Sequence, residues 1–123
     1  MLELFVPEVV ANEDGTSEEI VLGKTSGRPL LLTLGITQIL EQESLDVSIW
    51  GSADREQWRQ IAAYPRKFYC GTYLLLVDLA RVTHIRYLRV QWRMGRWGET
   101  GPEPVAGFYV AAEELKYQTA GAA

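Results

Sequence analysis

Cysteine and histidine are the side chains best suited to act as nucleophile and base, and the chain has one of each, Cys70 and His84. A Cys-His pair can support covalent catalysis, but no nucleophile motif surrounds either residue, and both fall in segments that we expect to be strands. A single histidine also excludes a metal site with two histidine ligands. We therefore interpret Cys70 as a small buried apolar residue and His84 as a polar residue that begins a strand near the surface.

Three pairs of carboxylates could do acid–base work or bind a hard cation. The pairs are Glu18 with Glu19, Glu41 with Glu43, and Glu113 with Glu114. Adjacent residues in a strand point to opposite faces, so only Glu41 and Glu43 could share a face. We interpret all these carboxylates as solvated charges. The Gly-Lys-Thr triplet at 23–25 lacks the glycine of a phosphate-binding loop five positions earlier, where Glu18 stands. We expect no metal, no cofactor and no enzymatic activity.

Arginine and tryptophan gather in one short segment, which provides the best candidate for a binding surface. Its members are Arg86, Arg89, Trp92, Arg93, Arg96 and Trp97. The loop 96–104 is rich in glycine and proline, and such loops often carry binding residues. We expect the contact residues to be Trp97, Arg96, Arg93, Arg89 and Tyr87, because tryptophan and arginine anchor interfaces. The alternative for Trp97 is a lid over the end of the core.

Alternation of apolar and polar residues predicts the strands that position these side chains. In one strand, Leu88, Val90 and Trp92 share one face, while Tyr87, Arg89, Gln91 and Arg93 share the other. Turn-forming residues separate the alternating runs. We expect strands near 2–10, 18–23, 30–40, 45–51, 57–63, 67–79, 84–94 and 105–115. Short helical turns at 38–44 and 113–117 are the alternatives. We also expect Trp58 and Val90 to face the core.

Eight short strands predict an all-β, two-sheet antiparallel sandwich or jelly roll. The chain has 123 residues, of which 47% are hydrophobic and 23% charged, which is typical of one globular domain. We predict a single domain at 1–117 and a frayed tail at 118–123. No apolar run approaches the length of a membrane span, and the first residues do not resemble a signal peptide. We expect a location in the cytoplasm or in an assembled particle.

The net charge of −4 conceals two regions of opposite sign. Residues 1–46 hold nine acidic residues and two basic ones, whereas residues 55–97 hold nine basic residues and two acidic ones. Strands from different parts of a sandwich interleave, so we expect these charges to pair across strands rather than to form a nucleic-acid site.

One stretch, residues 45–58, resembles the strand, turn and strand of discoidin-type and coagulation-factor C-type domains. There an extended strand leads into a Ser-x-Asp-x-x-x-Trp hairpin, and Ser52, Asp54 and Trp58 occupy those positions. Residues 85–90 are similar to the Arg-Tyr-x-Arg strand of the same families. The resemblance implies a galactose-binding-like jelly roll. Arg55 replaces the usual turn glycine and the paired terminal cysteines are missing, which weakens an extracellular lectin role. Asp54 can accept hydrogen bonds from its own turn.

A longer stretch, from Leu30 to Ala112, is similar to small sandwich proteins found among phage virion components and their bacterial relatives. Its order is Leu-x-Leu-Gly-Ile-Thr, Ser-Leu-Asp-Val-Ser-Ile, Ser-Ala-Asp, a Phe-Tyr strand, Tyr-Leu-Arg-Val-Gln-Trp and Phe-Tyr-Val. We interpret the chain as a non-catalytic interaction module for protein–protein assembly or a virion-like structural role. Its expected partner is a protein or a second copy of itself. The alternative is a carbohydrate-binding module of the discoidin type.

Overall fold

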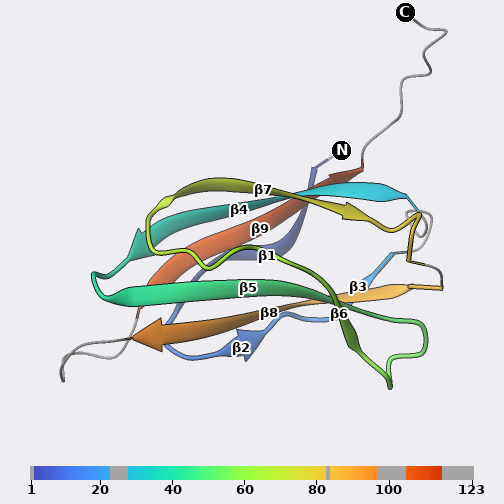
Figure 1. Ribbon diagram of the computed structural model, residues 1–123, viewed down its shortest axis with the longest axis horizontal. Helices are drawn as coiled ribbons and strands as arrows, with labels where there is room; N and C mark the ends of the chain where they lie inside the picture. The colour runs from blue at the N-terminus through green and yellow to red at the C-terminus, as the bar shows by residue number, and fades with distance from the viewer. Residues whose placement is uncertain (1, 23–27, 83, 97–104, 115–123) are drawn as a thin grey trace, which may run out of the picture.

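Two antiparallel β-sheets pack face to face in the computed structural model, which describes residues 2–22, 28–82, 84–96 and 105–114 (Figure 1). Sheet A contains, in spatial order, β1 (Leu2–Ala11), β9 (Ala106–Glu114), β4 (Pro29–Ile39) and β7 (Gly71–Asp78). Sheet B contains β2 (Gly15–Thr16), β8 (Tyr87–Arg96), β5 (Glu43–Ser52) and β6 (Arg59–Ala63), and β3 (Ile20–Val21) also pairs with β8. Among these residues there is no helix long and apolar enough to cross a membrane.

The order of the strands is that of a jelly roll. If β2 and β3 are counted as one interrupted strand, the eight strands form two four-stranded sheets. Consecutive strands lie in different sheets except β5 and β6, which pair with each other, and the first strand lies beside the last. The predicted all-β sandwich is therefore confirmed. The described residues contain nine strands rather than eight. In place of one expected strand at 18–23 there are two short strands, β2 and β3, which each have two residues and pair with β8.

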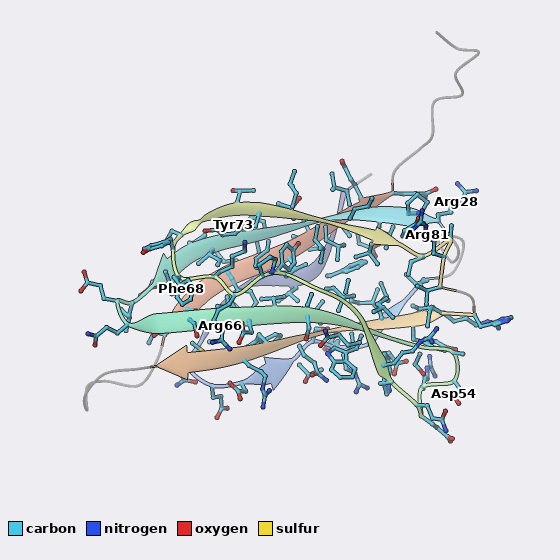
Figure 2. The ribbon with its side chains drawn as sticks, in the orientation of Figure 1. Arg28, Asp54, Arg66, Phe68, Tyr73 and Arg81 are labelled. Carbon is cyan, nitrogen blue, oxygen red and sulfur yellow. The ribbon has the colours of Figure 1, made fainter. Side chains whose placement is uncertain are left out.

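Alternation of side chains builds the core between the sheets, as Figure 2 shows. In the middle of the four central strands every second residue is buried, since successive side chains of a strand point to opposite faces. The most deeply buried of these side chains are Leu32 and Leu34 of β4, Leu45, Val47 and Ile49 of β5, Leu88 and Val90 of β8, and Phe108 and Val110 of β9. The predicted inward faces of residues 45–49 and 88–90 are thus confirmed.

An aromatic contact joins the two sheets near one end of the core. The ring of Trp92 in β8 meets the ring of Phe108 in β9 edge to face, with 5.3 Å between their centroids. The Trp92 ring also lies so close to Gly15 that a Cβ there would come within 2.4 Å of it. Only glycine lets β2 approach β8 this closely, so the short strand depends on that residue.

Some predicted strand limits were wrong where loops leave the sheets. The segment 64–70 is a connection that is linked to β5 of sheet B by the pairing of Lys67 with Leu45 and by a hydrogen bond from the Tyr64 N–H to the Val47 carbonyl. Strand β7 therefore begins at Gly71 instead of near residue 67. Neither of the alternative helical turns, at 38–44 and 113–117, is present in the described residues. Residues 40–42 form the turn between β4 and β5, and Glu113 and Glu114 belong to β9. Residues 115–123, with the predicted tail, lie outside the described part of the chain.

Trp58 was wrongly predicted to face the core. It lies just before β6, where alternation along a strand does not yet apply, and its half-buried ring packs under the guanidinium of Arg89 at 4.0 Å. Arg89 points outward from β8, so Trp58 belongs to the outer surface of sheet B. Val90, the other residue expected in the core, is fully buried.

We predict opposite consequences for two aromatic truncations. Phe108→Ala removes a fully buried ring from β9, an inner strand of sheet A, and should lower the free energy of unfolding by about 3–5 kcal/mol. Trp58→Ala removes a surface contact with Arg89 and should cost about 1 kcal/mol. Urea denaturation followed by circular dichroism measures both values. Equal losses for the two variants would contradict the assignment of Trp58 to the outer surface.

Candidate functional site

Three of the five predicted contact residues lie together on the outer face of β8. Tyr87, Arg89 and Arg93 alternate there with buried residues of the same strand. The side chain of Arg96 and the whole of Trp97 fall outside the described residues, as does the rest of the loop to residue 104. Both interpretations of Trp97, as a contact residue and as a lid, thus concern a residue outside the described part of the chain.

Cross-strand pairing extends this surface over β5 and β6. In register, Ser48 lies opposite Gln91, and Trp50 lies between Arg89 on one side and Gln60 on the other. We call this outer surface of sheet B the arginine face. It consists of Tyr87, Arg89, Gln91 and Arg93 of β8, Ser48 and Trp50 of β5, Gln60 of β6, and Trp58. The sequence showed that Trp50 alternates with core residues, but register was needed to bring it beside Arg89.

Two arginines of this region stack on aromatic rings. The Arg89 guanidinium lies 4.0 Å from the centroid of the Trp58 ring, and the Arg55 guanidinium lies 4.5 Å from the centroid of the Tyr87 ring. Each stack orients a planar cation while leaving its N–H groups free to bind an acceptor. Each aromatic ring thus supports one face of a guanidinium and limits its movement.

The charges of the arginine face are only partly neutralised. Asp46 stands directly opposite Arg93 in register, but both of its carboxylate oxygens accept hydrogen bonds from the Nε of Arg66, at 3.0 and 3.2 Å. That contact raises the pKa of the Arg66 guanidinium. Within the described ranges, Arg89 and Arg93 form no ion pair with a carboxylate. The surface therefore offers two cations that can take an anionic group.

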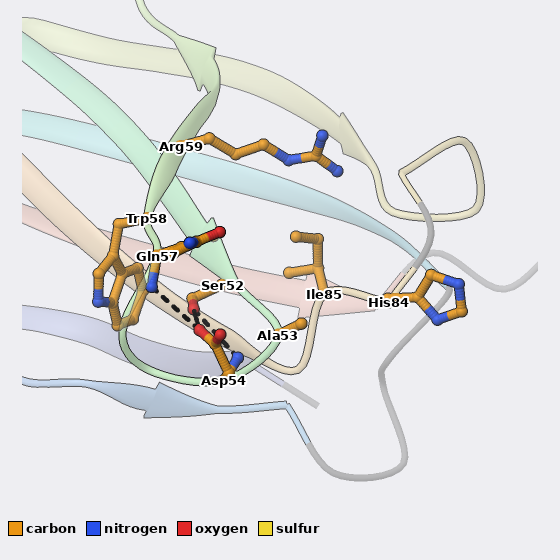
Figure 3. Close-up of a pocket in the computed structure, with 9 residues that line it drawn as sticks. Ser52, Ala53, Asp54, Gln57, Trp58, Arg59, His84 and Ile85 are labelled. Carbon is orange, nitrogen blue, oxygen red and sulfur yellow. Dashed lines mark hydrogen bonds between the residues drawn. The ribbon is translucent and has the colours of Figure 1, made fainter.

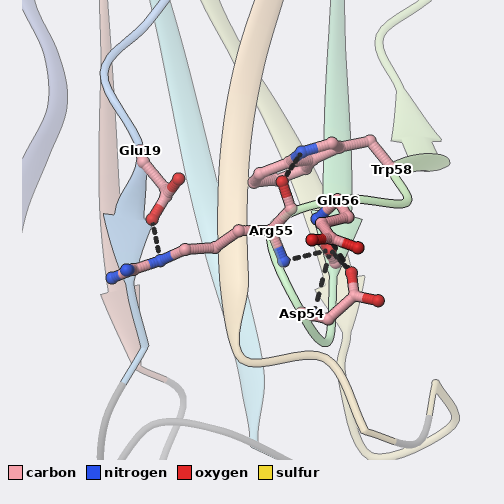
Figure 4. A network of polar contacts seen from close by, with 6 residues as sticks. Glu19, Asp54, Arg55, Glu56 and Trp58 are labelled. Atoms are coloured by element: carbon pink, nitrogen blue, oxygen red, sulfur yellow. Dashed lines mark hydrogen bonds and ion pairs between the residues drawn. The ribbon is translucent and has the colours of Figure 1, made fainter.

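A tight turn between β5 and β6 sets the position of Arg55, as Figure 4 shows. The Oγ of Ser52 accepts hydrogen bonds from the backbone N–H groups of Asp54 and Arg55, at 3.2 and 2.9 Å. The Oδ1 of Asp54 accepts from the N–H groups of Glu56 and Gln57, at 2.9 and 3.0 Å. These two amide bonds and the Ser52 hydroxyl lower the pKa of the Asp54 carboxyl. The predicted role of Asp54 in its turn is confirmed.

The geometry of this turn explains the glycine that Arg55 replaces. Arg55 has a φ of +71°, a left-handed conformation that glycine adopts without cost. Its side chain leaves the turn, stacks on Tyr87 and forms an ion pair with Glu19. Acidic groups of the first third thus pair with bases of the middle third, at Glu19 with Arg55 and at Asp46 with Arg66, as the charge distribution predicted.

A shallow groove of about 410 Å³ lies at the β2 side of the arginine face. It is lined by Asp14, Gly15, Thr16, Ser48, Trp50, Gln60, Gln91, Trp92 and Arg93. The indole N–H of Trp50 donates a hydrogen bond to the Oγ of Ser48 at 2.9 Å, which fixes the ring within the groove. The groove is lined by two amide side chains, two hydroxyls, a carboxylate and an arginine beside two tryptophans, so it can combine ring contact with polar contacts.

A second hollow, of about 370 Å³, lies at the end of β5 (Figure 3). It is lined by Gly51, Ser52, Ala53, Asp54, Gln57, Trp58, Arg59, His84 and Ile85. His84 is exposed, as expected, but lies in the turn before β8 rather than in a strand. The oxygen Oδ1 of Asp54 that faces the turn is occupied by amides.

Cys70 was wrongly predicted to be buried in a strand. It is exposed, and it precedes β7 in the connection from β6. It lines a third hollow, of about 530 Å³, together with Glu43, at the start of β5. His84 lies beside Ser52 at the other end of the same strand, about 30 Å away at the rise of an extended chain. Cys70 and His84 thus do not form a pair.

Glu43 was wrongly predicted to be a solvated charge. Only 1% of its surface is exposed, and its Oε2 accepts a hydrogen bond from the backbone N–H of Val105 at 2.9 Å. Among the residues that the structure describes, its Oε1 has no hydrogen-bond partner, and neither does the buried hydroxyl of Tyr64, whose pKa is raised by burial. Glu41 stays exposed in the neighbouring turn. In the described part of the chain, no cluster of three or more His, Cys, Asp or Glu residues could hold a metal ion.

The fold has a counterpart among phage proteins. The crystal structure of the SPBc2 prophage-derived protein YomS superimposes with a TM-score of 0.54, over 92% of each chain. The two sequences are 11% identical, so the likeness concerns the fold alone. No protein-family model matches the chain, and no curated protein matches it either. The likeness to YomS agrees with the predicted resemblance to phage sandwich proteins, and the discoidin-type resemblance gains no support from these comparisons.

We predict that the Ser52–Trp58 turn loses stability in acid through Asp54. The folded pKa of this carboxyl lies below its ordinary value of 3.8, so its contribution is fully present above that value and is lost as the pH falls through the folded pKa. Asp54→Ala should therefore lower the melting temperature at pH 7, and the difference from the unmodified chain should shrink at pH 3 and below. Thermal scans across this range test it. A difference that is independent of pH would contradict the assignment.

Proposed function

We propose that this chain is a non-catalytic interaction module that mediates protein–protein assembly, with a structural role of the virion type. The observation that carries the proposal is the arginine face, on which Arg89 and Arg93 have no carboxylate partner among the described residues. The fold likeness to a prophage-derived protein supports the virion-type role. Such a role places the chain in the cytoplasm or in an assembled particle.

Charge and shape define the partner. Interfaces are enriched in tryptophan, tyrosine and arginine, and these are the residues that the arginine face presents. Because Arg89 and Arg93 form no ion pair with a carboxylate among the described residues, we propose a protein surface that carries carboxylates. Arginine binds a carboxylate with two parallel hydrogen bonds, which gives direction as well as attraction. The acidic Asp14 at the groove and the net charge of −4 make a nucleic acid a poor partner.

A photo-crosslinking experiment tests this surface. We predict that a photoreactive residue at position 91, between Arg89 and Arg93, will capture a partner in the native cells, whereas one at the well-exposed position 81 will not. The captured protein supports the proposal only if it is an assembly component and binds the purified chain. Arg89→Ala with Arg93→Ala should weaken that binding by about tenfold or more, and added salt should weaken it further.

The matched control is Arg81→Ala, which removes a cation at the end of β7 that already pairs with Asp78. It should leave binding unchanged. The Trp97→Ala variant distinguishes the two roles considered for that residue. If Trp97 is a contact residue, the variant should bind more weakly at an unchanged melting temperature. If Trp97 is a lid, the variant should melt at a lower temperature and bind normally. Equal capture at positions 81 and 91, or full binding by the double variant, would contradict the proposal.

Carbohydrate binding is a second candidate, favoured by the groove around Trp50. Its ring is fixed by Ser48, and the amides of Gln60 and Gln91 border it, which is a combination that can stack on a sugar ring and bind its hydroxyls. This candidate needs no acidic partner, so it can be distinguished from the first.

We predict, for this second candidate, that a glycan array will identify a ligand whose titration changes tryptophan fluorescence. Trp50→Ala should weaken binding by about tenfold or more, whereas Trp58→Ala, which alters a tryptophan outside the groove, should not. If no glycan binds, or if Trp50→Ala binds as the unmodified chain does, carbohydrate is not the ligand.

A further inference from the structure

The described chain leaves four sheet edges, and three of them are poorly suited to pairing with another strand. Strand β1 carries Glu3, Pro7 and Glu8, and its pairing with β9 is interrupted by two register shifts. Strand β6 has five residues, begins with Arg59 and also contains a register shift against β5. The opposite edge of sheet B consists of β2 and β3, with two residues each. Charges, prolines, bulges and short length are the features by which proteins keep edge strands from pairing.

Strand β7 is the exception. It has eight residues and pairs with β4 without a register shift, from Gly71 opposite Ile36 to Asp78 opposite Pro29. It contains no proline, and its only charged residue is Asp78 at its end. No other described strand pairs with its second side, so a row of backbone N–H and C=O groups is available there. This edge is regular, long and uncharged.

The outer side chains of β7 are apolar as well. Leu74 is 63% exposed and Leu76 is 55% exposed. In register, Leu76 lies beside Leu31 of β4, and Leu74 lies beside Thr33. The cross-strand row that contains Leu74 and Thr33 continues to Ala111 of β9 and then to Leu4 of β1. Exposed leucines that form rows at an open edge indicate a surface that is covered in the working assembly.

We propose that β7 is the dimer interface of this protein, where a second copy of the chain adds its own β7 antiparallel about a two-fold axis. The two sheets A then join into one eight-stranded sheet. The inference goes beyond the proposed function, because it concerns another surface and another partner than the arginine face. A two-fold axis brings the same patch of both copies together, so an antiparallel strand without internal charges is its own complement.

Charge does not oppose this arrangement. Asp78, which ends the strand, already forms an ion pair with Arg81, and the segment 71–77 carries no charged side chain. Antiparallel pairing of this segment with itself therefore brings no like charges together. The register that pairs the uncharged segment 71–77 with itself places Leu74 opposite Leu74 of the second copy. It also keeps the exposed leucines of both copies on one face, since directly opposed residues share a face.

The oligomeric state of variants tests the interface. We predict that the unmodified chain has in solution twice the mass of its 13.9 kDa monomer, by light scattering after gel filtration. Leu74→Lys with Leu76→Lys places like charges across the two-fold axis and should give a monomer with an unchanged circular dichroism spectrum. The matched control is Leu4→Lys with Val10→Lys, two residues 55% and 64% exposed on the other edge strand of the same sheet. It should remain a dimer.

A crosslink tests the register and does not depend on the lysine variants folding. Leu74→Cys in a Cys70→Ser background should form a disulfide-linked dimer on mild oxidation, because opposed Cα atoms of an antiparallel pair lie within disulfide range. Leu4→Cys in the same background should not. A monomeric unmodified chain, or a dimer that persists in the Leu74 and Leu76 double lysine variant, would overturn the proposal. The Arg89→Ala and Arg93→Ala double variant should remain a dimer. That result would show that the β7 interface does not depend on the arginine face, so that either proposal can fail without the other.

Discussion

Burial of alternate side chains between the two sheets is the constraint on which the rest of the molecule depends. Phe108, Leu88 and Val90 must lie inside for the sandwich to exclude water from its core. Because a strand has a period of two, a residue on either side of a buried one must point out. Arg89 and Arg93 point outward for this reason, and a slip of one residue would turn them toward the core. The arginine face is thus the outer side of the same packing that stabilises the fold.

Where this alternation ends, hydrogen bonds within turns determine the positions of the side chains. Ser52 and Asp54 use their side-chain oxygens to hold four backbone amides, and the resulting left-handed conformation at Arg55 turns its side chain toward Glu19 and Tyr87. The same turn brings Trp58 under Arg89. The turn that carries the discoidin-type sequence pattern therefore also places Arg55 against Tyr87 and Trp58 against Arg89, two residues of the arginine face.

The two proposed surfaces lie on different sheets and follow different physical rules. The arginine face is polar and charged, and it suits a partner that differs from the chain itself. The β7 edge offers backbone groups and leucines, and it suits a second copy, whose strand has the same pattern. An assembly module that used both would display two arginine faces for each dimer, and paired weak contacts of this kind raise the overall strength of binding.

The sequence by itself determined the class of the fold, because alternation and turn residues are local. It placed Leu45, Val47 and Ile49 inside, Tyr87, Arg89 and Arg93 outside, and it identified Asp54 as the acceptor of its turn. Only the tertiary structure decided which strands are neighbours. Register across strands pairs Trp50 with Arg89, and the chain path carries Glu43 under Val105 into the core, exposes Cys70 and leaves β7 at an open edge. These contacts join residues far apart in the sequence, and a local pattern contains no information about which distant strand will lie beside it.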